Sequence, residues 1–220
     1  MNKASPYDSF YSKLMDLSVW IYTNILRFGK YENESIIKFA AAVENSNVLD
    51  YGCNTGRHAS NVKQAYGYNV MGADINPAAI SVAQRKGIPA ELITPNFFEK
   101  YKFSFDVIIN SHVLEHMDDP KELLVNIRGL LKEEGTFVIA IPQERIRGDI
   151  SPLQILYFLS RLKFENPHKH NFSKDQLFTL LIEAGFTPKE HIFCNFIPPF
   201  LTKDRIFITS RSLVVKCTKN

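Results

Sequence analysis

The stretch that decides the fold reads Val48-Leu49-Asp50-Tyr51-Gly52-Cys53-Asn54-Thr55-Gly56. An apolar run ends at Gly52, and residues 57–66 then place apolar side chains on one helical face, so the pattern predicts a strand, a glycine turn and a helix. Gly52 and Gly56 can adopt a positive φ, and Asn54 between them is of a type that tolerates the left-handed region. Because glycines occur in the turns of many such units, the turn alone is weak evidence for a binding site.

The same alternation of short apolar runs and capped helical patterns continues from about residue 46 onward, which is typical of βαβ units around a parallel sheet. Further strands are expected at residues 70–74, 90–93, 105–110, 136–141, 189–195 and 212–218. Capped helices are expected from Asn76 to Gly87, from Asp119 to Gly135 and from Ser173 to Gly185.

Two segments stand outside this alternation. Residues 1–45 have a mostly helical pattern rich in aromatic residues, and residues 143–172 separate the fifth strand from the next helix. A connection of that length is usually a functional lid with its own short helix, here over residues 152–162. We therefore expect an N-terminal helical cap over residues 1–45 and one domain over residues 46–220, with a lid insertion at 143–172.

Composition narrows the class of protein. The 220 residues include 26 Lys and Arg against 23 Asp and Glu, a net charge of +3 that is too small to favour nucleic acid or a membrane surface. Cys53, Cys194 and Cys217 are far apart and form no C-x-x-C pair, which favours a reducing compartment. The N-terminus lacks the apolar core of a signal peptide, so we expect a cytoplasmic protein.

An acidic residue ends the second expected strand. Asp74 follows Asp50 by 24 residues, where a carboxylate can accept both hydroxyl groups of a ribose. A nucleoside-bearing cofactor is therefore expected. Dinucleotide binders require G-x-G-x-x-G, and the residues from Gly52 to Gly56 do not match that fingerprint.

Several segments, in order, resemble the class I S-adenosylmethionine-dependent methyltransferases, in particular their small-molecule members of types 11 and 12. Residues 48–58 are similar to the motif D-x-G-x-G-x-G, with Asn54 in place of the middle glycine. Residues 70–77 resemble the second motif, V-x-G-x-D-x-N/S-P, and residues 105–119 resemble an F-D run followed by V-L-E-H. Residues 132–136 stand where the family has L-K-P-G-G, without its proline and first glycine. The resemblance covers about residues 47–142 and continues weakly through 168–186.

The resemblance implies an α/β fold, a Rossmann-like doubly wound seven-stranded mixed sheet with N-terminal helices and the lid insertion. It also implies S-adenosylmethionine as cofactor, with Asp74 at the ribose and Asn96 and Phe97 at the adenine. The implied cofactor-binding residues are Asp50, Gly52, Cys53, Asn54, Gly56, Asp74, Ile75, Asn96, Phe97, Asn110 and Ser111. Asn110-Ser111-His112 replaces the N/D-P-P-Y of enzymes that methylate amino groups of nucleic acids, which favours small-molecule O-methylation.

A hydroxyl acceptor needs its proton removed, and histidine suits this task at neutral pH. The candidate bases are His168, His170 and His116, with His112 also nearby in sequence; each of them has an ordinary polar or buried role as its alternative. Glu115-His116 resembles the end of the E-x-x-E-H run of ubiquinone-pathway O-methyltransferases, whose first Glu is His112 here. Mixed histidine and carboxylate side chains could hold a divalent ion, but a capping or core role is favoured for so short a run, and we leave a metal unassigned.

The acceptor itself is open. Basic residues from Arg145 to His170 either form a solvated face or receive a carboxylate or phosphate of the acceptor. We predict methyl transfer to a small molecule at oxygen, with no membrane partner, nucleic acid disfavoured and the oligomeric state unassigned. The alternatives are an RNA methyltransferase and a cofactor-binding protein without catalysis.

Overall fold

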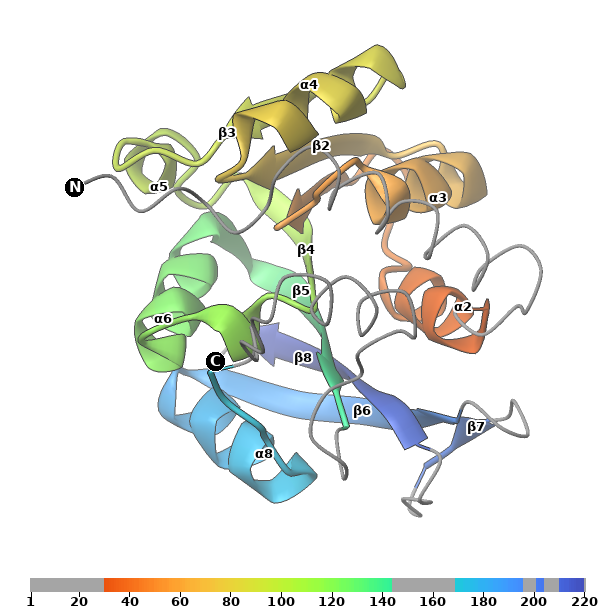
Figure 1. Ribbon diagram of the computed structural model, residues 1–220, viewed down its shortest axis with the longest axis vertical. Helices are drawn as coiled ribbons and strands as arrows, with labels where there is room; N and C mark the ends of the chain where they lie inside the picture. Colours follow the sequence, from red (N-terminus) through yellow and green to blue (C-terminus); the bar gives the residue numbers. More distant parts are fainter. Residues whose placement is uncertain (1–29, 144–168, 196–200, 204–209, 220) are drawn as a thin grey trace, which may run out of the picture.

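The computed structural model describes residues 30–143, 169–195, 201–203 and 210–219. Within these ranges one sheet has the strand order β3-β2-β1-β4-β5-β8-β6-β7 (Figure 1). The strands are β1 (Asn47–Tyr51), β2 (Asn69–Asp74), β3 (Ala90–Leu92), β4 (Phe105–Ser111), β5 (Leu131–Pro142), β6 (Phe186–Asn195), β7 (Leu201–Thr202) and β8 (Ser210–Lys219). Seven of them are the expected strands, and the two-residue β7 extends the sheet beside β6. The sheet is mixed, because β1 to β5 pair in parallel and β8 runs antiparallel between β5 and β6.

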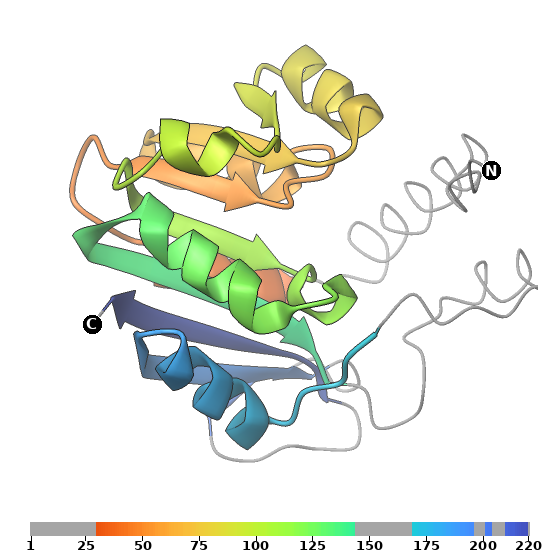
Figure 2. The same ribbon diagram turned by 90° about the vertical axis from the view of Figure 1, so that its left-hand side faces the viewer.

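Helices cover both faces of this sheet. They are α2 (Lys30–Phe39), α3 (Arg57–Tyr66), α4 (Pro77–Arg85), α5 (Phe97–Lys100), the short 3-10 helix η2 (Leu114–His116), α6 (Pro120–Leu130) and α8 (Lys174–Glu183). Figure 2 shows α6 and α8 in front of the strands and α2 behind them. Alternate residues of β1 divide between the two layers: Leu49 packs with α6 and α8, and Val48 packs with α2 and α3. No helix in the described part of the chain combines the length and hydropathy needed to cross a bilayer.

The local signals for helix starts are confirmed. The Asn76 side chain accepts the Ala78 N–H at 3.0 Å, and the Asp119 side chain accepts the Glu122 N–H at 2.9 Å. Ser173 and Gln176 form the expected reciprocal capping box at the start of α8. These caps fix where each helix leaves the carboxyl edge of the sheet.

The expected end of the helix that starts at Asp119 is wrong. Helix α6 ends at Leu130, and β5 begins at Leu131, so Gly135 lies inside a strand instead of closing the helix. Leu131 is fully buried and pairs with Phe105, after which the register shifts before Thr136 pairs with Val107. Because Leu130 and Leu131 are buried on either side of the junction, apolar periodicity could not locate it.

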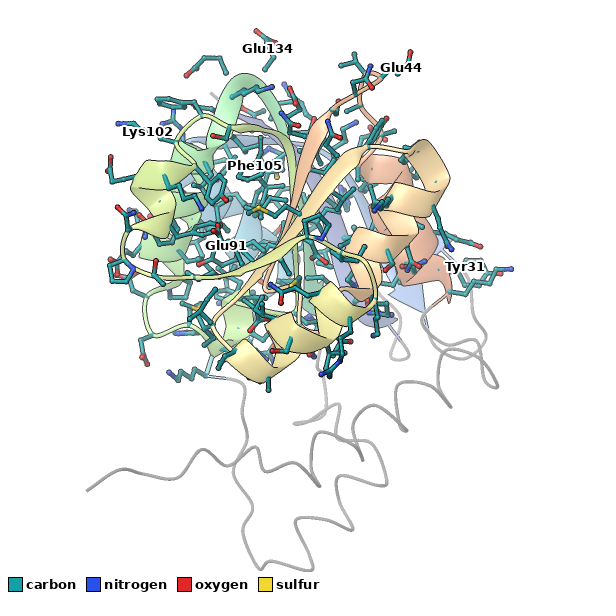
Figure 3. The ribbon with its side chains drawn as sticks, turned by 90° about the horizontal axis from the view of Figure 1, so that it is seen from above. Tyr31, Glu44, Glu91, Lys102, Phe105 and Glu134 are labelled. Carbon is teal, nitrogen blue, oxygen red and sulfur yellow. The ribbon has the colours of Figure 1, made fainter. Side chains whose placement is uncertain are left out.

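Register brings the ends of three strands together. Tyr51 pairs with Ala73 of β2 and with Asn110 of β4, so the segments that follow these strands share one carboxyl edge. The opposite edge carries the charged residues Glu44, Lys102 and Glu134 near the starts of β1, β4 and β5 (Figure 3). Helix α2 adds Ile36 and Phe39 to the core on one face, while the proposed cap boundary at residue 45 stays a prediction. The lid helix expected at residues 152–162 lies outside the described residues.

Candidate functional site

The turn after β1 has the backbone that its glycines and asparagine suggest. Gly52, Asn54 and Gly56 all have positive φ, at 78°, 47° and 77°. The N–H groups of Gly52 and Cys53 both donate to Ala73 O, at 2.7 and 3.0 Å, which ties the turn to β2. A Cβ at Gly52 would fall 2.2 Å from Val113 Cγ2, so the segment after β4 packs directly on the turn. The turn is therefore a fixed, left-handed loop at the carboxyl edge.

Asp74 stands beside this turn. One carboxylate oxygen accepts the Asn54 N–H at 2.8 Å, and the other accepts the Asn76 N–H at 2.9 Å. A carboxylate offers about four lone-pair positions, so about two remain for a ligand. Ile75, next in the chain, has a side chain that is 77% exposed. A hydrogen-bond acceptor and an apolar surface thus lie together at the end of β2.

Asp50 and Cys53 lie beneath the turn, where both are buried. Asp50 Oδ2 accepts the Ala59 N–H of α3 at 3.0 Å, and burial raises the pKa of this carboxyl to about 7. Burial also raises the pKa of the Cys53 thiol, which fills the space beside Gly72. Both side chains support the turn from inside, and their contact with a cofactor stays a prediction.

Asn96 and Phe97 follow β3 and behave differently from each other. Asn96 is exposed at the start of α5, and its side chain makes no capping bond. The Phe97 ring is 2% exposed and packs against Phe98 and Tyr101, with ring centroids 5.9 and 4.9 Å away. Asn96 is therefore available to a ligand at this edge, whereas the ring of Phe97 belongs to the core.

Asn110 and Ser111 end β4 next to the turn. Asn110 is fully buried, and its Nδ2 donates to Tyr51 O at 3.2 Å. In the described part of the chain, Asn110 Oδ1 and Ser111 Oγ are buried and have no hydrogen-bond partner. Buried polar atoms of this kind usually have partners, so their position favours a ligand or water at this point.

Two of the candidate histidines meet Glu115 of η2, His116 at its buried carboxylate and His170 at its backbone carbonyl. His116 Nε2 lies 4.0 Å from Glu115 Oε1, and the N–H groups of Lys169 and His170 donate to Glu115 O at 2.8 and 3.1 Å. The His170 ring stacks on Phe172 with centroids 5.6 Å apart. The end of the segment 143–172 therefore meets η2, while His168 lies outside the described residues.

The sequence does not predict two features of this region, a contact between Glu32 and His112 and a groove beside α8. Glu32 of α2 lies 3.1 Å from His112 Nε2, across 80 residues of chain, and no local pattern signals that contact. An open groove of about 540 Å³ also runs beside α8, lined by His170, Phe172, Asp175, Gln176, Thr179 and Glu183 among others. No three His, Cys, Asp or Glu side chains among the described residues converge in an arrangement that could hold a metal ion.

Several curated proteins with similar sequences are described as ubiquinone biosynthesis O-methyltransferases. The ubiquinone biosynthesis O-methyltransferase of Cereibacter sphaeroides is 28% identical over 159 residues, which make up 66% of this chain and 62% of that protein. The protein of the same description from Rickettsia canadensis is 22% identical over 191 residues, 83% of this chain and 79% of that protein. The chain thus spans less than two thirds of the length of the Cereibacter protein.

Several solved structures with the same architecture are described as methyltransferases. An S-adenosylmethionine-dependent methyltransferase from Thermotoga maritima has a TM-score of 0.68 at 19% identity, covering 96% of this chain and 98% of that one. Another from Aquifex aeolicus has a TM-score of 0.65 at 15% identity, covering 94% and 96%. At these identities the likeness shows the fold.

A family model described as a methyltransferase domain matches residues 25–191, most of the chain, and confirms the resemblance of the motifs. The chain belongs to this family of methyltransferase domains.

Proposed function

We propose that this chain is an S-adenosylmethionine-dependent methyltransferase that transfers a methyl group to a hydroxyl oxygen of a small-molecule acceptor. The observation that carries the proposal is the carboxylate of Asp74 beside the left-handed turn. Two of its lone-pair positions accept backbone N–H groups, and no bond within the described part of the chain uses the others, which could accept the two hydroxyl groups of a ribose.

The other residues at the carboxyl edge fit the same cofactor. The exposed side chains of Ile75 and Asn96 offer an apolar contact and a hydrogen bond to an adenine. Asn110 Oδ1 and Ser111 Oγ lie near the turn without partners in the described part of the chain, where the polar amino-acid end of the cofactor would satisfy them. In this proposal residues 52–56 contact that same end through their backbone.

Bound S-adenosylmethionine would supply a methyl group activated by a sulfonium, so the chain has to position the acceptor and take its proton. Histidine is the side chain type best suited to this step. Among the candidates His170, His116 and His168, the two that the structure describes are half-exposed. The bond from the His170 N–H to Glu115 O holds that residue beside η2. We assign the role of general base to this group of histidines.

The acceptor class follows from the relatives and from the motif after β4. The relatives from Cereibacter and Rickettsia are O-methyltransferases by description, and Asn110-Ser111-His112 lacks the pattern of nucleic-acid amino methylation. The basic residues from Arg145 to His170 are the candidates to receive an anionic acceptor, and the described Lys169 pairs through Nζ with Asp118 at 2.5 Å. The cysteines Cys53, Cys194 and Cys217 are buried free thiols, which agrees with a cytoplasmic location.

Isothermal titration calorimetry tests the cofactor. The proposal expects S-adenosylmethionine and S-adenosylhomocysteine to bind and NAD to fail; the reverse result would point to a dehydrogenase. Cell extracts incubated with the protein and methyl-labelled cofactor then test the acceptor. A labelled small molecule supports the proposal, whereas label found only in RNA would replace it with RNA methylation.

A further inference from the structure

One ionic contact joins α2 to the segment that follows β4. His112 Nε2 lies 3.1 Å from Glu32 Oε2, and His112 Nδ1 lies 3.5 Å from Glu115 Oε1. The Glu32 side chain is 8% exposed and that of Glu115 is 1% exposed, while the imidazole between them is 33% exposed. Both ring nitrogens of His112 therefore face carboxylates that are shielded from water.

His112 has an unusual backbone conformation, which the contacts of its side chain help to maintain. Its φ is 56°, in the left-handed region that residues with a side chain rarely adopt. Its N–H donates to Ala140 O at 2.9 Å, and the next residue, Val113, packs against Gly52 of the turn. Any change at His112 would therefore be transmitted to the turn through Val113.

The charges around the imidazole favour its protonated form. Burial opposes the positive charge, but Glu32 and Glu115 outweigh it and raise the pKa of His112 to about 10. Among the described residues, Arg57, His58 and His116 also lie nearby, and the Cys194 thiol lies near Glu32. Burial and Arg57 lower the pKa of His58 to about 3, so that histidine is neutral. The two carboxylates therefore favour the protonated form of His112 at neutral pH, which has no lone pair to accept a proton.

We propose that Glu32, His112 and Glu115 form a bridge of two carboxylates and one imidazolium that holds the segment after β4 against the glycine turn. His112 is then a positioning residue for methyl transfer and is excluded as its base. This inference rests on the proposed function, because it gives the turn to the cofactor. The bridge also makes α2 part of the proposed cofactor site, because Glu32 of α2 reaches the carboxyl edge of the sheet.

The test compares Glu32→Gln with Glu34→Gln. Both residues lie on α2, but Glu34 is a surface residue whose nearest described cation is Lys30 at 3.7 Å. S-adenosylhomocysteine is titrated into each folded variant, and the His112 imidazole is followed by ¹⁵N NMR between pH 6 and 10. We expect wild type and Glu34→Gln to keep His112 protonated at pH 8 and to bind alike. Glu32→Gln should lose that proton at a lower pH and bind about fivefold or more weakly.

Each result decides a separate point. A neutral His112 in the wild type at pH 8 would overturn the bridge, and so would wild-type affinity in a folded Glu32→Gln variant. If Glu32→Gln does not fold, His112→Gln takes its place: its amide can still donate to Glu32 but carries no charge, and wild-type affinity there would overturn the proposal. If the wild type binds no S-adenosylhomocysteine, the proposed function fails, while the NMR titration still decides whether the bridge exists.

Discussion

At the scale of single residues, the site depends on a few backbone conformations that the residue types in the turn predict. Gly52, Asn54 and Gly56 were predicted to take positive φ, and all three do. Contact of Asp74 with a ribose stays a prediction. The structure shows that its carboxylate holds the turn through the Asn54 N–H, a role that strand patterns cannot reveal. Glu32 could not be predicted, because its contact with His112 depends on how α2 packs.

Replacing Gly52 with alanine tests the turn. The residue has φ of 78°, and a Cβ would meet Val113 at 2.2 Å, so Gly52→Ala should shift the segment after β4 and weaken S-adenosylhomocysteine binding about tenfold or more. Gly67→Ala is the matched control, since φ is 67° there and nothing lies within 4 Å. It should cost about 1 kcal/mol of stability and leave affinity unchanged. Equal affinities for the two variants would disprove the special role of Gly52.

The buried Asp50 makes a prediction about pH. Its pKa is raised by burial to about 7, so between about pH 4 and 7 the folded protein keeps a proton that the unfolded chain releases. The free energy of unfolding should therefore fall as pH rises through this range. Asp50→Asn keeps an acceptor for Ala59 without the charge, and should be more stable than wild type by about 2–4 kcal/mol at pH 8, with the difference vanishing near pH 4.

Urea unfolding at several pH values measures this effect. Asp106→Asn is the control: burial opposes ionisation there, but Lys132 lowers the pKa of Asp106, so this substitution should not stabilise the protein at pH 8. Parallel stability curves for wild type and Asp50→Asn would show that Asp50 ionises normally in the folded state.

At the scale of elements, the signals that the sequence carries locally were reliable. Asn76, Asp119 and Ser173 cap helices as predicted, because each cap is a contact within three residues. The junction between α6 and β5 was misplaced, because it depends on the pairing of Leu131 with Phe105 in another strand. Local chemistry thus gives the starts of elements, while pairing across the sheet decides this boundary.

The segment before α8 carries the prediction about catalysis. His168→Ala combined with His170→Ala should leave S-adenosylmethionine affinity within a few-fold of wild type and lower turnover by about 10²-fold, the usual scale for a lost general base. Single-turnover methylation of an acceptor found in the extract screen measures the chemical step. Lys174→Ala, at the start of the same helix, should react like wild type. An unaltered rate in the double variant would remove both histidines from the mechanism.

At the scale of the whole molecule, the sheet could be predicted from the sequence, whereas the contribution of helix α2 to the site could not. The alternating pattern gave the parallel strands and both antiparallel strands at the end, and the observed sheet has them with β7 added. Helix α2 packs its buried residues against the same core, although its sequence carries none of the family motifs. The N-terminal part therefore contributes to the fold and, through Glu32, to the carboxyl edge.

The central claim is that this edge binds S-adenosylmethionine through Asp74, and one calorimetric series tests it most directly. S-adenosylhomocysteine is titrated into wild type, Asp74→Ala and Asp106→Ala. The last variant is the control, because the Asp106 carboxylate also accepts a backbone N–H but lies at the opposite edge of the sheet. The account predicts binding to wild type and Asp106→Ala, and a loss of about 1.5–3 kcal/mol for Asp74→Ala, the scale of hydrogen bonds to a charged acceptor. Wild-type affinity in a folded Asp74→Ala variant would contradict it.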